Sequence, residues 1–159
     1  MTKPQETGER VIATNRKAFF NYEILDRAEA GVALLGTEVK SIREGGFNFK
    51  DAYVDFRGGE LFLVGARIGP YSHGNLMNHP DERDRKLLLH KREILKFGGK
   101  ATEKGFTILP LKAYFKKGRV KMEIGLARGK KAHDKRESIK RKELERETRQ
   151  AVRARRDSA

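Results

Sequence analysis

The sequence predicts a mainly β protein in which short antiparallel strands close into a small barrel with short helices, followed by a basic tail. Two observations predict the strands: apolar and polar residues alternate over several short segments, and glycine-containing turns separate these segments. The tail is predicted because the last fifth of the chain has no aromatic residue and few large aliphatic ones. The 159 residues are enough for one compact domain and an appendage.

Two hairpins are predicted from the alternation. The first joins residues 51–57 to residues 60–68 through Gly58-Gly59. One face of its first strand is formed by Ala52, Val54 and Phe56, and one face of its second strand by Phe62, Val64, Ala66 and Ile68. The other hairpin joins residues 106–115 to residues 119–127 through Lys116-Lys117-Gly118. The apolar face of its second strand is formed by Val120, Met122, Ile124 and Leu126.

The remaining elements are one more strand pair and three helices. Residues 22–28 and 32–35 are predicted to form a pair that turns at Glu29-Ala30-Gly31. Helices are predicted around residues 15–20, from a cap at Thr37 to Arg43 before Gly45-Gly46, and within residues 90–102. Gly98 and Gly99 weaken the last of these helices.

Six short strands with a helix between the middle and final pairs predict a closed barrel of the oligonucleotide-binding type. Closure removes the exposed sheet edges that would otherwise invite pairing with other chains. The same pattern would also allow an open α+β sheet. We favour the barrel because the hairpins follow one another with tight turns.

Composition divides the chain into a flexible leader at residues 1–10, the barrel at residues 11–127 and the tail at residues 128–159. The tail carries 13 Lys and Arg against 6 Asp and Glu, with no Gly or Pro after Gly129. It is predicted to be disordered when free, because it can bury too little apolar surface to offset its conformational entropy. Its helix-forming residues and the i,i+4 pair of Glu145 with Arg149 predict a helix when an anionic partner neutralises it. A nonspecific electrostatic tether is the alternative interpretation.

The net charge indicates the class of partner. The chain has 36 Lys and Arg against 22 Asp and Glu, a formal charge of +14, which favours nucleic acid or an anionic membrane. No apolar stretch approaches the ~20 residues that span a bilayer, so we expect no membrane partner. The polar N-terminal residues lack the apolar run of a secretory signal and the chain has no cysteine, so we expect a cytoplasmic location.

Six motifs resemble, in the same order, those of one family: small protein B, the SsrA-binding protein that partners transfer-messenger RNA. They lie between about Val11 and Arg141, and each is weak alone, whereas six in register are highly specific. The motifs are Asn15-Arg16-Lys17-Ala18, Glu29-Ala30-Gly31, Gly36-Thr37-Glu38-Val39-Lys40-Ser41, Arg85-Lys86-Leu87-Leu88-Leu89-His90, Gly125-Leu126-Ala127-Arg128-Gly129-Lys130-Lys131 and His133-Asp134-Lys135-Arg136.

The resemblance implies a barrel that holds the tRNA-like domain of transfer-messenger RNA. It also implies a tail that enters the decoding centre and the vacant message channel of a stalled ribosome, where it becomes helical. The protein would act without catalysis, cofactor or metal. We expect a monomer that binds the RNA one to one.

Two groups of candidate site residues follow from the resemblance and from the charge pattern. RNA-binding candidates in the barrel are Asn15, Arg16, Lys17, Glu29, Lys40, Lys86, Leu88 and His90. Candidates in the tail for binding the ribosome or RNA are Arg128, Gly129, Lys130, Lys131, His133, Asp134, Lys135 and Arg136. Many family members carry asparagine where this chain has His90, but imidazole can also donate a hydrogen bond or stack on a base.

Without the family, several of these residues have simpler interpretations. A turn carboxylate such as Glu29 is usually only solvated, and His90 would be an ordinary surface histidine. In the run Leu87-Leu88-Leu89 at least one leucine must point outward, because successive strand residues face opposite sides. The segment from Gly36 to Ser41 would serve the fold by capping a helix.

Two other functions stay open. For an enzyme, there is no phosphate-binding glycine-rich loop or nucleophile elbow, and the four histidines lack a metal-ligand spacing. A nuclease built on scattered carboxylates is still an alternative. His133 beside Asp134 is the most tempting catalytic pair, but a basic tail offers no rigid pocket. A ribosomal protein or assembly factor would fit the composition equally well, and only the ordered motifs argue against it.

Overall fold

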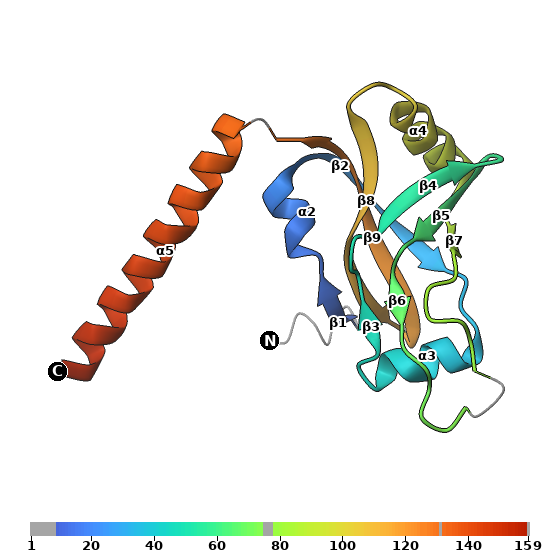
Figure 1. Ribbon diagram of the computed structural model, residues 1–159, viewed down its shortest axis with the longest axis horizontal. Helices are drawn as coiled ribbons and strands as arrows, with labels where there is room; N and C mark the ends of the chain where they lie inside the picture. Colours follow the sequence, from blue (N-terminus) through green and yellow to red (C-terminus); the bar gives the residue numbers. More distant parts are fainter. Residues whose placement is uncertain (1–8, 75–77, 131, 159) are drawn as a thin grey trace.

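The computed structural model describes residues 9–74, 78–130 and 132–158, and their secondary structure is mainly β (Figure 1). Residues 1–8 of the predicted leader lie outside the described residues. The elements are β1 (Glu9–Thr14), α2 (Arg16–Asn21), β2 (Tyr22–Val32), α3 (Gly36–Arg43), β3 (Phe47–Asn48), β4 (Tyr53–Arg57), β5 (Glu60–Val64), β6 (Arg67–Ile68), β7 (Arg85–Leu88), α4 (Lys91–Ala101), β8 (Phe106–Lys116), β9 (Arg119–Gly129) and α5 (Ala132–Ser158).

The main sheet closes on itself. In the described part of the chain it has seven strands in the order β1-β8-β4-β5-β7-β2-β9, and β8 also pairs with β9. All of these pairings are antiparallel. β8 therefore completes a ring with β4 on one edge and β9 on the other, while β1 pairs with the C-terminal half of β8. The predicted small antiparallel barrel is confirmed.

Both predicted hairpins form. The β4–β5 turn uses Gly58 and Gly59 at φ of 55° and 79°, and the β8–β9 turn uses Lys117 and Gly118 at 52° and 76°. Left-handed backbone of this kind is what two-residue hairpin turns require. The predicted inward face of β9 is also confirmed, because its four apolar residues are at most 9% exposed.

The second strand of the first hairpin is shorter than predicted. β5 ends at Val64, and its buried residues are Leu61 and Leu63. Further along, Ala66 and Ile68 are buried, so the inward parity changes between the two segments. Gly65, at φ of +87°, makes this change, and β6 then pairs with β3 in a separate two-stranded sheet. The predicted common face of residues 62, 64, 66 and 68 is therefore wrong.

The predicted turn at Glu29-Ala30-Gly31 is also wrong. β2 runs unbroken through these residues, paired first with β9 and, from Gly31, with β7. Ala30 is fully buried opposite Met122 inside the barrel. Residues with local turn preference are held extended here because strands on both sides satisfy their backbone groups.

Each predicted helix is present, with one correction. Asn15 caps α2, because its Oδ1 accepts the Ala18 N–H. The cap predicted at Thr37 is wrong, since α3 begins at Gly36 and Glu38 accepts the Leu35 N–H at 2.8 Å. In α4, Gly98 does not break the helix. An added Cβ there would lie 2.5 Å from the ring of Phe56, so the missing side chain lets α4 approach β4.

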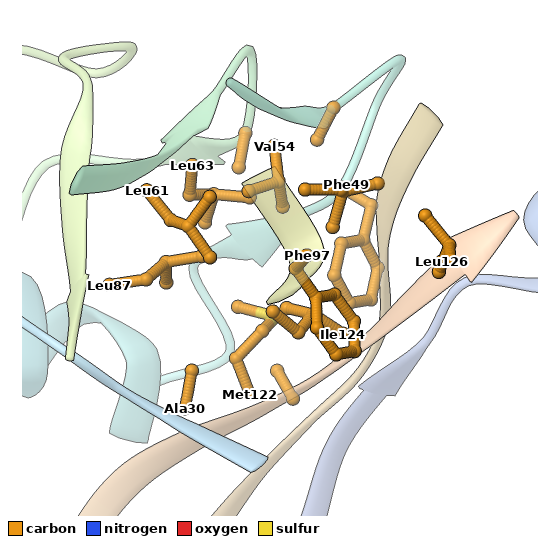
Figure 2. Packing of buried hydrophobic residues seen from close by; sticks show 14 of the residues in the cluster. Ala30, Phe49, Val54, Leu61, Leu63, Leu87, Phe97, Met122, Ile124 and Leu126 are labelled. Atoms are coloured by element: carbon orange, nitrogen blue, oxygen red, sulfur yellow. The ribbon is translucent and has the colours of Figure 1, made fainter. Parts of the chain in front are cut away.

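The core lies inside the barrel and under α4. Figure 2 shows side chains of β5, β7, β9 and α4 directed toward one another. The labelled residues that are at most 2% exposed are Ala30, Leu61, Leu63, Leu87, Phe97, Met122 and Ile124. Burying large aliphatic and aromatic side chains of this kind contributes about 1.5–3 kcal/mol each. The inward residues of β5 and β7 consequently fix which residues of those strands face solvent.

A buried ion pair anchors β7 to α3. The side chains of Glu38 and Arg85 are both fully buried, and Arg85 Nε donates to Glu38 Oε2 at 2.8 Å. Arg83 donates to the other carboxylate oxygen at 2.7 Å. Burial alone would raise the pKa of Glu38, but hydrogen bonds from Arg83, the Leu35 N–H and Arg85 lower it below its ordinary value. The carboxylate therefore stays charged and holds the start of β7 in place.

The tail is one long helix. Figure 1 shows α5 leaving the barrel after β9, and Lys142 Nζ lies 4.8 Å from the centre of the Phe20 ring of α2. The predicted start of the tail at Arg128 is wrong, because Arg128 and Gly129 belong to β9, and disorder of the remaining tail in the free chain stays a prediction. Among the described residues, none of the helices combines the length and apolar character needed to cross a bilayer.

Candidate nucleic-acid interface

The predicted residues of β7 and its extension form one outward row. Arg85 and Leu87 are fully buried, so Lys86, Leu88 and His90 alternate with them on the solvent side. Leu88 is 51% exposed and is the outward leucine that the triple-leucine run predicts. His90 follows as the N-cap residue of α4 and is exposed. Because Arg85 and Leu87 point into the barrel, the cation of Lys86, the apolar side chain of Leu88 and the imidazole of His90 all face solvent.

The pairing of β2 with β7 brings Glu29 to the same surface. Gly31 is directly opposite Leu88, and a Cβ added to Gly31 would lie 3.3 Å from the Leu88 Cβ. Glu29 is two residues earlier on β2 and therefore shares the face of Gly31. We call Glu29, Lys86, Leu88 and His90 the β2–β7 patch. The structure brings these four predicted residues together although 61 positions separate the first from the last.

The Glu29 carboxylate is held by two groups of β8. The Tyr114 hydroxyl donates to Oε2, and Lys116 Nζ lies 3.3 Å from the same oxygen. The hydrogen bond from Tyr114 is the main cause that lowers the pKa of Glu29, Lys116 adds to it, and partial burial opposes it. Glu29 is therefore an ionised acceptor on a surface that is otherwise rich in cations.

The predicted α2 residues lie at the other end of β2. Tyr22 directly follows α2, and seven strand residues from it to Glu29 span about 23 Å. Asn15 is 8% exposed, since its Nδ2 donates to Pro110 O at 2.8 Å and its Oδ1 accepts the Ala18 N–H. Its amide is therefore used by the fold, whereas Arg16 and Lys17 are exposed. They form a second cationic area, not part of the β2–β7 patch.

Lys40 lies apart from both areas. It is exposed on α3, and its Nζ is 5.5 Å from the centre of the Tyr71 ring. This cation–π contact places it over the segment that follows β6. A phosphate contact by Lys40 stays a prediction.

The first predicted tail residues belong to the barrel. Arg128 and Gly129 end β9, where Arg128 Nη2 is 2.5 Å from Glu23 Oε1 and Gly129 pairs with Tyr22. The Lys130 N–H donates to Asn21 O at 3.0 Å. Lys131 lies outside the described residues, as do the side chains of His133, Asp134 and Lys135 within α5. Arg136 is exposed on α5.

A basic cleft of about 750 Å³ lies between α2 and α5. Its lining combines two aromatic rings with many cations, the composition typical of surfaces that bind single-stranded nucleic acid. The lining residues are Arg16, Phe19, Phe20, Lys130, Arg141, Lys142, Glu145, Arg146, Arg149, Gln150 and Arg153. Sequence reasoning named only Arg16 and Lys130 of these as site residues. The signal that points to this cleft is the aromatic pair Phe19-Phe20, which follows Arg16-Lys17 after a single alanine.

The described residues hold no cluster of three His, Asp or Glu side chains that could bind a metal ion. The outward faces of β2 and β7, the exposed cations of α2 and the basic helix α5 are instead surfaces suited to phosphate and base contacts. A small antiparallel barrel with such surfaces defines the class of nucleic-acid-binding barrel proteins.

The comparisons with known proteins identify the family. The family model described as "SmpB protein" matches residues 12–154, and the chain belongs to this family. It is 57% identical to the SsrA-binding protein of Syntrophobacter fumaroxidans over 138 residues, which cover 87% of this chain and 86% of that protein. It is 52% identical to the SsrA-binding protein of Carboxydothermus hydrogenoformans over 147 residues, covering 92% and 99%.

A solved structure described as "tmRNA-SmpB: a journey to the center of the bacterial ribosome" also matches. The TM-score is 0.65 with 47% sequence identity, and the match covers 80% of this chain and 93% of that chain. The predicted family is therefore confirmed.

Proposed function

We propose that this protein binds the tRNA-like domain of transfer-messenger RNA and delivers it to stalled ribosomes, where translation switches to the RNA's own reading frame. Membership of the SmpB family over residues 12–154 is the observation that carries this proposal. Relatives that share about half of their residues with this chain over nearly its whole length are SsrA-binding proteins. The protein acts in the cytoplasm as a noncatalytic monomer that binds the RNA one to one.

The barrel is the specific RNA binder in this proposal. The β2–β7 patch combines an ionised acceptor, an exposed leucine and a histidine, which can respectively accept hydrogen bonds, cover a sugar or base, and stack. Arg16, Lys17 and Lys40 supply phosphate contacts that position the RNA without reading its sequence. Proteins recognise folded RNA mainly by its shape, so such dispersed contacts suit a tRNA-like elbow.

The tail is the ribosome probe. Residues 128–159 carry 13 Lys and Arg against 6 Asp and Glu, and the helix α5 over Ala132–Ser158 supports a helical form of this segment. We infer that it is disordered when free, and that it becomes helical in the decoding centre and the empty downstream message channel. Lys130, Lys131, Lys135 and Arg136 meet phosphates there, with Gly129, His133 and Asp134 in the same motif. A ribosome that still holds message in this channel would exclude the tail.

The test is a titration of two chains against the tRNA-like domain, an elongator tRNA and a ribosomal RNA fragment, at low and moderate salt. One chain is full length and the other ends at Lys130, which keeps all of β9 and the hydrogen bond from Lys130 to Asn21. We expect the shortened chain to keep tight, selective binding to the tRNA-like domain. Loss of selectivity, or binding that disappears with the tail or at moderate salt, would show a general electrostatic RNA binder instead.

The same samples test the tail and the oligomeric state. Circular dichroism of the full chain minus that of the shortened chain should show little helix without RNA. A strong helical difference would refute the disordered free state. Light scattering should give one protein per RNA, and a salt-resistant dimer would refute the monomer.

A further inference from the structure

Glu29 occupies an unusual position for a carboxylate that binds RNA. It lies directly opposite Glu123 on β9, and like charges that face each other across a sheet repel. A phosphate backbone would repel it as well. To help RNA binding, its carboxylate must therefore point at a hydrogen-bond donor such as a base amino group or a 2′-hydroxyl.

Tyr114 is placed to aim this carboxylate. Tyr114 pairs with Lys121 on β9, and Lys121 pairs with Gly31 on β2. Paired residues share a face of the sheet, and Glu29 shares the face of Gly31, so the Tyr114 side chain is on the same face as Glu29. It is nevertheless only 4% exposed, and Lys112 Nζ lies 5.2 Å from the centre of its ring. The ring is thus enclosed, and its hydroxyl is fixed against Glu29 Oε2.

The two oxygens of Glu29 are used unequally. Oε2 accepts from the Tyr114 hydroxyl and lies 3.3 Å from Lys116 Nζ. Within the described part of the chain, the one hydrogen-bond partner of Oε1 is the same lysine at 3.5 Å. Each carboxylate oxygen has two lone-pair sites, so Oε1 keeps accepting capacity. The side chain is 38% exposed, which leaves room for a ligand donor.

We propose that Tyr114 is a positioning residue for RNA selectivity, which holds Glu29 so that Oε1 faces an RNA donor beside Leu88. This rests on the proposed function, in which Glu29 contacts the tRNA-like domain. A freely rotating Glu29 would turn toward Lys116 or Lys121 and would lose rotamer entropy on binding. A fixed acceptor instead rejects any RNA that presents a phosphate there, so Tyr114 contributes selectivity more than general affinity.

The protonation states agree with these roles. Burial, followed by the Glu29 carboxylate, raises the pKa of Tyr114, so its hydroxyl stays a donor throughout the physiological range. The same hydrogen bond lowers the pKa of Glu29.

The experiment uses the full chain with Tyr114→Phe, which keeps the enclosed ring and removes only the hydroxyl. We expect affinity for the tRNA-like domain to fall about tenfold, with affinity for a single-stranded ribosomal RNA fragment changed less than about twofold. Tyr53→Phe is the matched control, because Tyr53 is 44% exposed on β4 and lies outside the β2–β7 patch. It should leave the ratio of the two affinities unchanged.

A double-mutant cycle with Glu29→Gln separates positioning from simple stability. If Tyr114 acts through Glu29, Tyr114→Phe should have almost no further effect in the Glu29→Gln background. Carbon-13 NMR of the Glu29 carboxyl should show its pKa rising toward the ordinary value in Tyr114→Phe. The rise in this pKa shows that the hydrogen bond is lost, whereas a structural role alone would move the melting temperature but not the coupling between the two substitutions in RNA affinity.

Three results would overturn the inference: unchanged selectivity in Tyr114→Phe, equal losses for every RNA, or effects that add independently in the double variant. If Glu29→Gln loses selectivity while Tyr114→Phe does not, the positioning role fails and the proposed function stands. A wild-type chain with no selectivity for the tRNA-like domain would refute both.

Discussion

Replacing Glu38 with alanine should strongly destabilise the barrel, because it leaves a buried guanidinium without its counter-charge. Both Glu38 and Arg85 have fully buried side chains. The carboxylate accepts from Arg85 Nε at 2.8 Å, from Arg83 Nη2 at 2.7 Å and from the Leu35 N–H at 2.8 Å. Alanine removes these hydrogen bonds together with the one from Arg83 Nε at 3.2 Å, and the loss includes the bond that caps α3.

The expected loss is about 3–5 kcal/mol of the free energy of unfolding, which is typical for breaking one side of a buried ion pair. The carbonyls of Ala66 and Asp81 still accept from Arg85 at 2.8 and 3.1 Å, so the guanidinium keeps some partners. For comparison, Glu82→Ala removes an ion pair with Lys50 whose side chains are 44% and 50% exposed. That control should cost less than about 1 kcal/mol.

Urea unfolding followed by circular dichroism measures both variants, with the slope of free energy against urea checked for two-state behaviour. A loss below about 1 kcal/mol for Glu38→Ala, or a loss equal to that of Glu82→Ala, would refute the reasoning. It would mean that water reaches Arg85 or that the guanidinium finds another anion. Because Arg85 begins β7, a confirmed loss would also tie the stability of this pair to the strand that displays the β2–β7 patch.

Three further predictions follow from packing and charge. Gly98→Ala should leave the protein about 1–3 kcal/mol less stable than Gly99→Ala, because a Cβ at Gly98 meets an aromatic ring of β4 at 2.5 Å and one at Gly99 meets nothing within 4 Å. Replacing glycine with alanine raises helix propensity equally at these two adjacent positions of α4. Equal melting temperatures of the two variants would therefore contradict the predicted clash at Gly98. Leu88→Ala should weaken binding to the tRNA-like domain with little change in stability, since Leu88 is 51% exposed, whereas Leu87→Ala should cost about 2–5 kcal/mol in urea unfolding. The opposite pattern would reverse the assigned faces of β7. Finally, the folded-state pKa of Glu38 lies below its ordinary value of 4.5, so its contribution to stability is present above that value and is lost as the pH falls through the lowered pKa. The urea midpoint of the wild-type protein should therefore fall as the pH is lowered, and Glu38→Gln should make this fall less steep. An equally steep fall in Glu38→Gln would show that Glu38 is not its cause.

The local elements were predictable where neighbouring residues decide the structure. The β8–β9 hairpin is marked by strict alternation in β9 and by Gly118 at a positive φ. The end of α3 is marked by Gly45, also at a positive φ. These features depend on contacts within a few residues, so the sequence alone contains their physical cause.

The errors occur where distant strands decide the structure. Glu29-Ala30-Gly31 has the local character of a turn, yet β9 and β7 hold it extended. Gly65 switches the inward face between β5 and β6, and a periodicity of two cannot reveal such a switch. Glu38 and Arg85 are 47 residues apart, and nothing in their local sequence predicts that both are buried.

The candidate site shows the same division. The resemblance identified Glu29, Leu88 and His90, and the triple leucine required one outward side chain, but the choice of Leu88 depends on Arg85 and Leu87 being buried. Tyr114 was indistinguishable from any other aromatic strand residue until the barrel placed β8 next to the Glu29 carboxylate.

By itself the sequence determined the family, the excess of positive charge, the hairpins and the helix-forming basic tail, because these follow from composition, motif order and short-range backbone preference. Only the tertiary structure decided the closure of β8 onto both β4 and β9, the continuous path of β2 and the meeting of Glu29, Leu88 and Tyr114 on one surface. The physical reason is that barrel closure depends on pairings between residues up to about a hundred positions apart. The stabilisation from these strand pairings appears only when the sheet and the core form together, so no short segment of the sequence contains it.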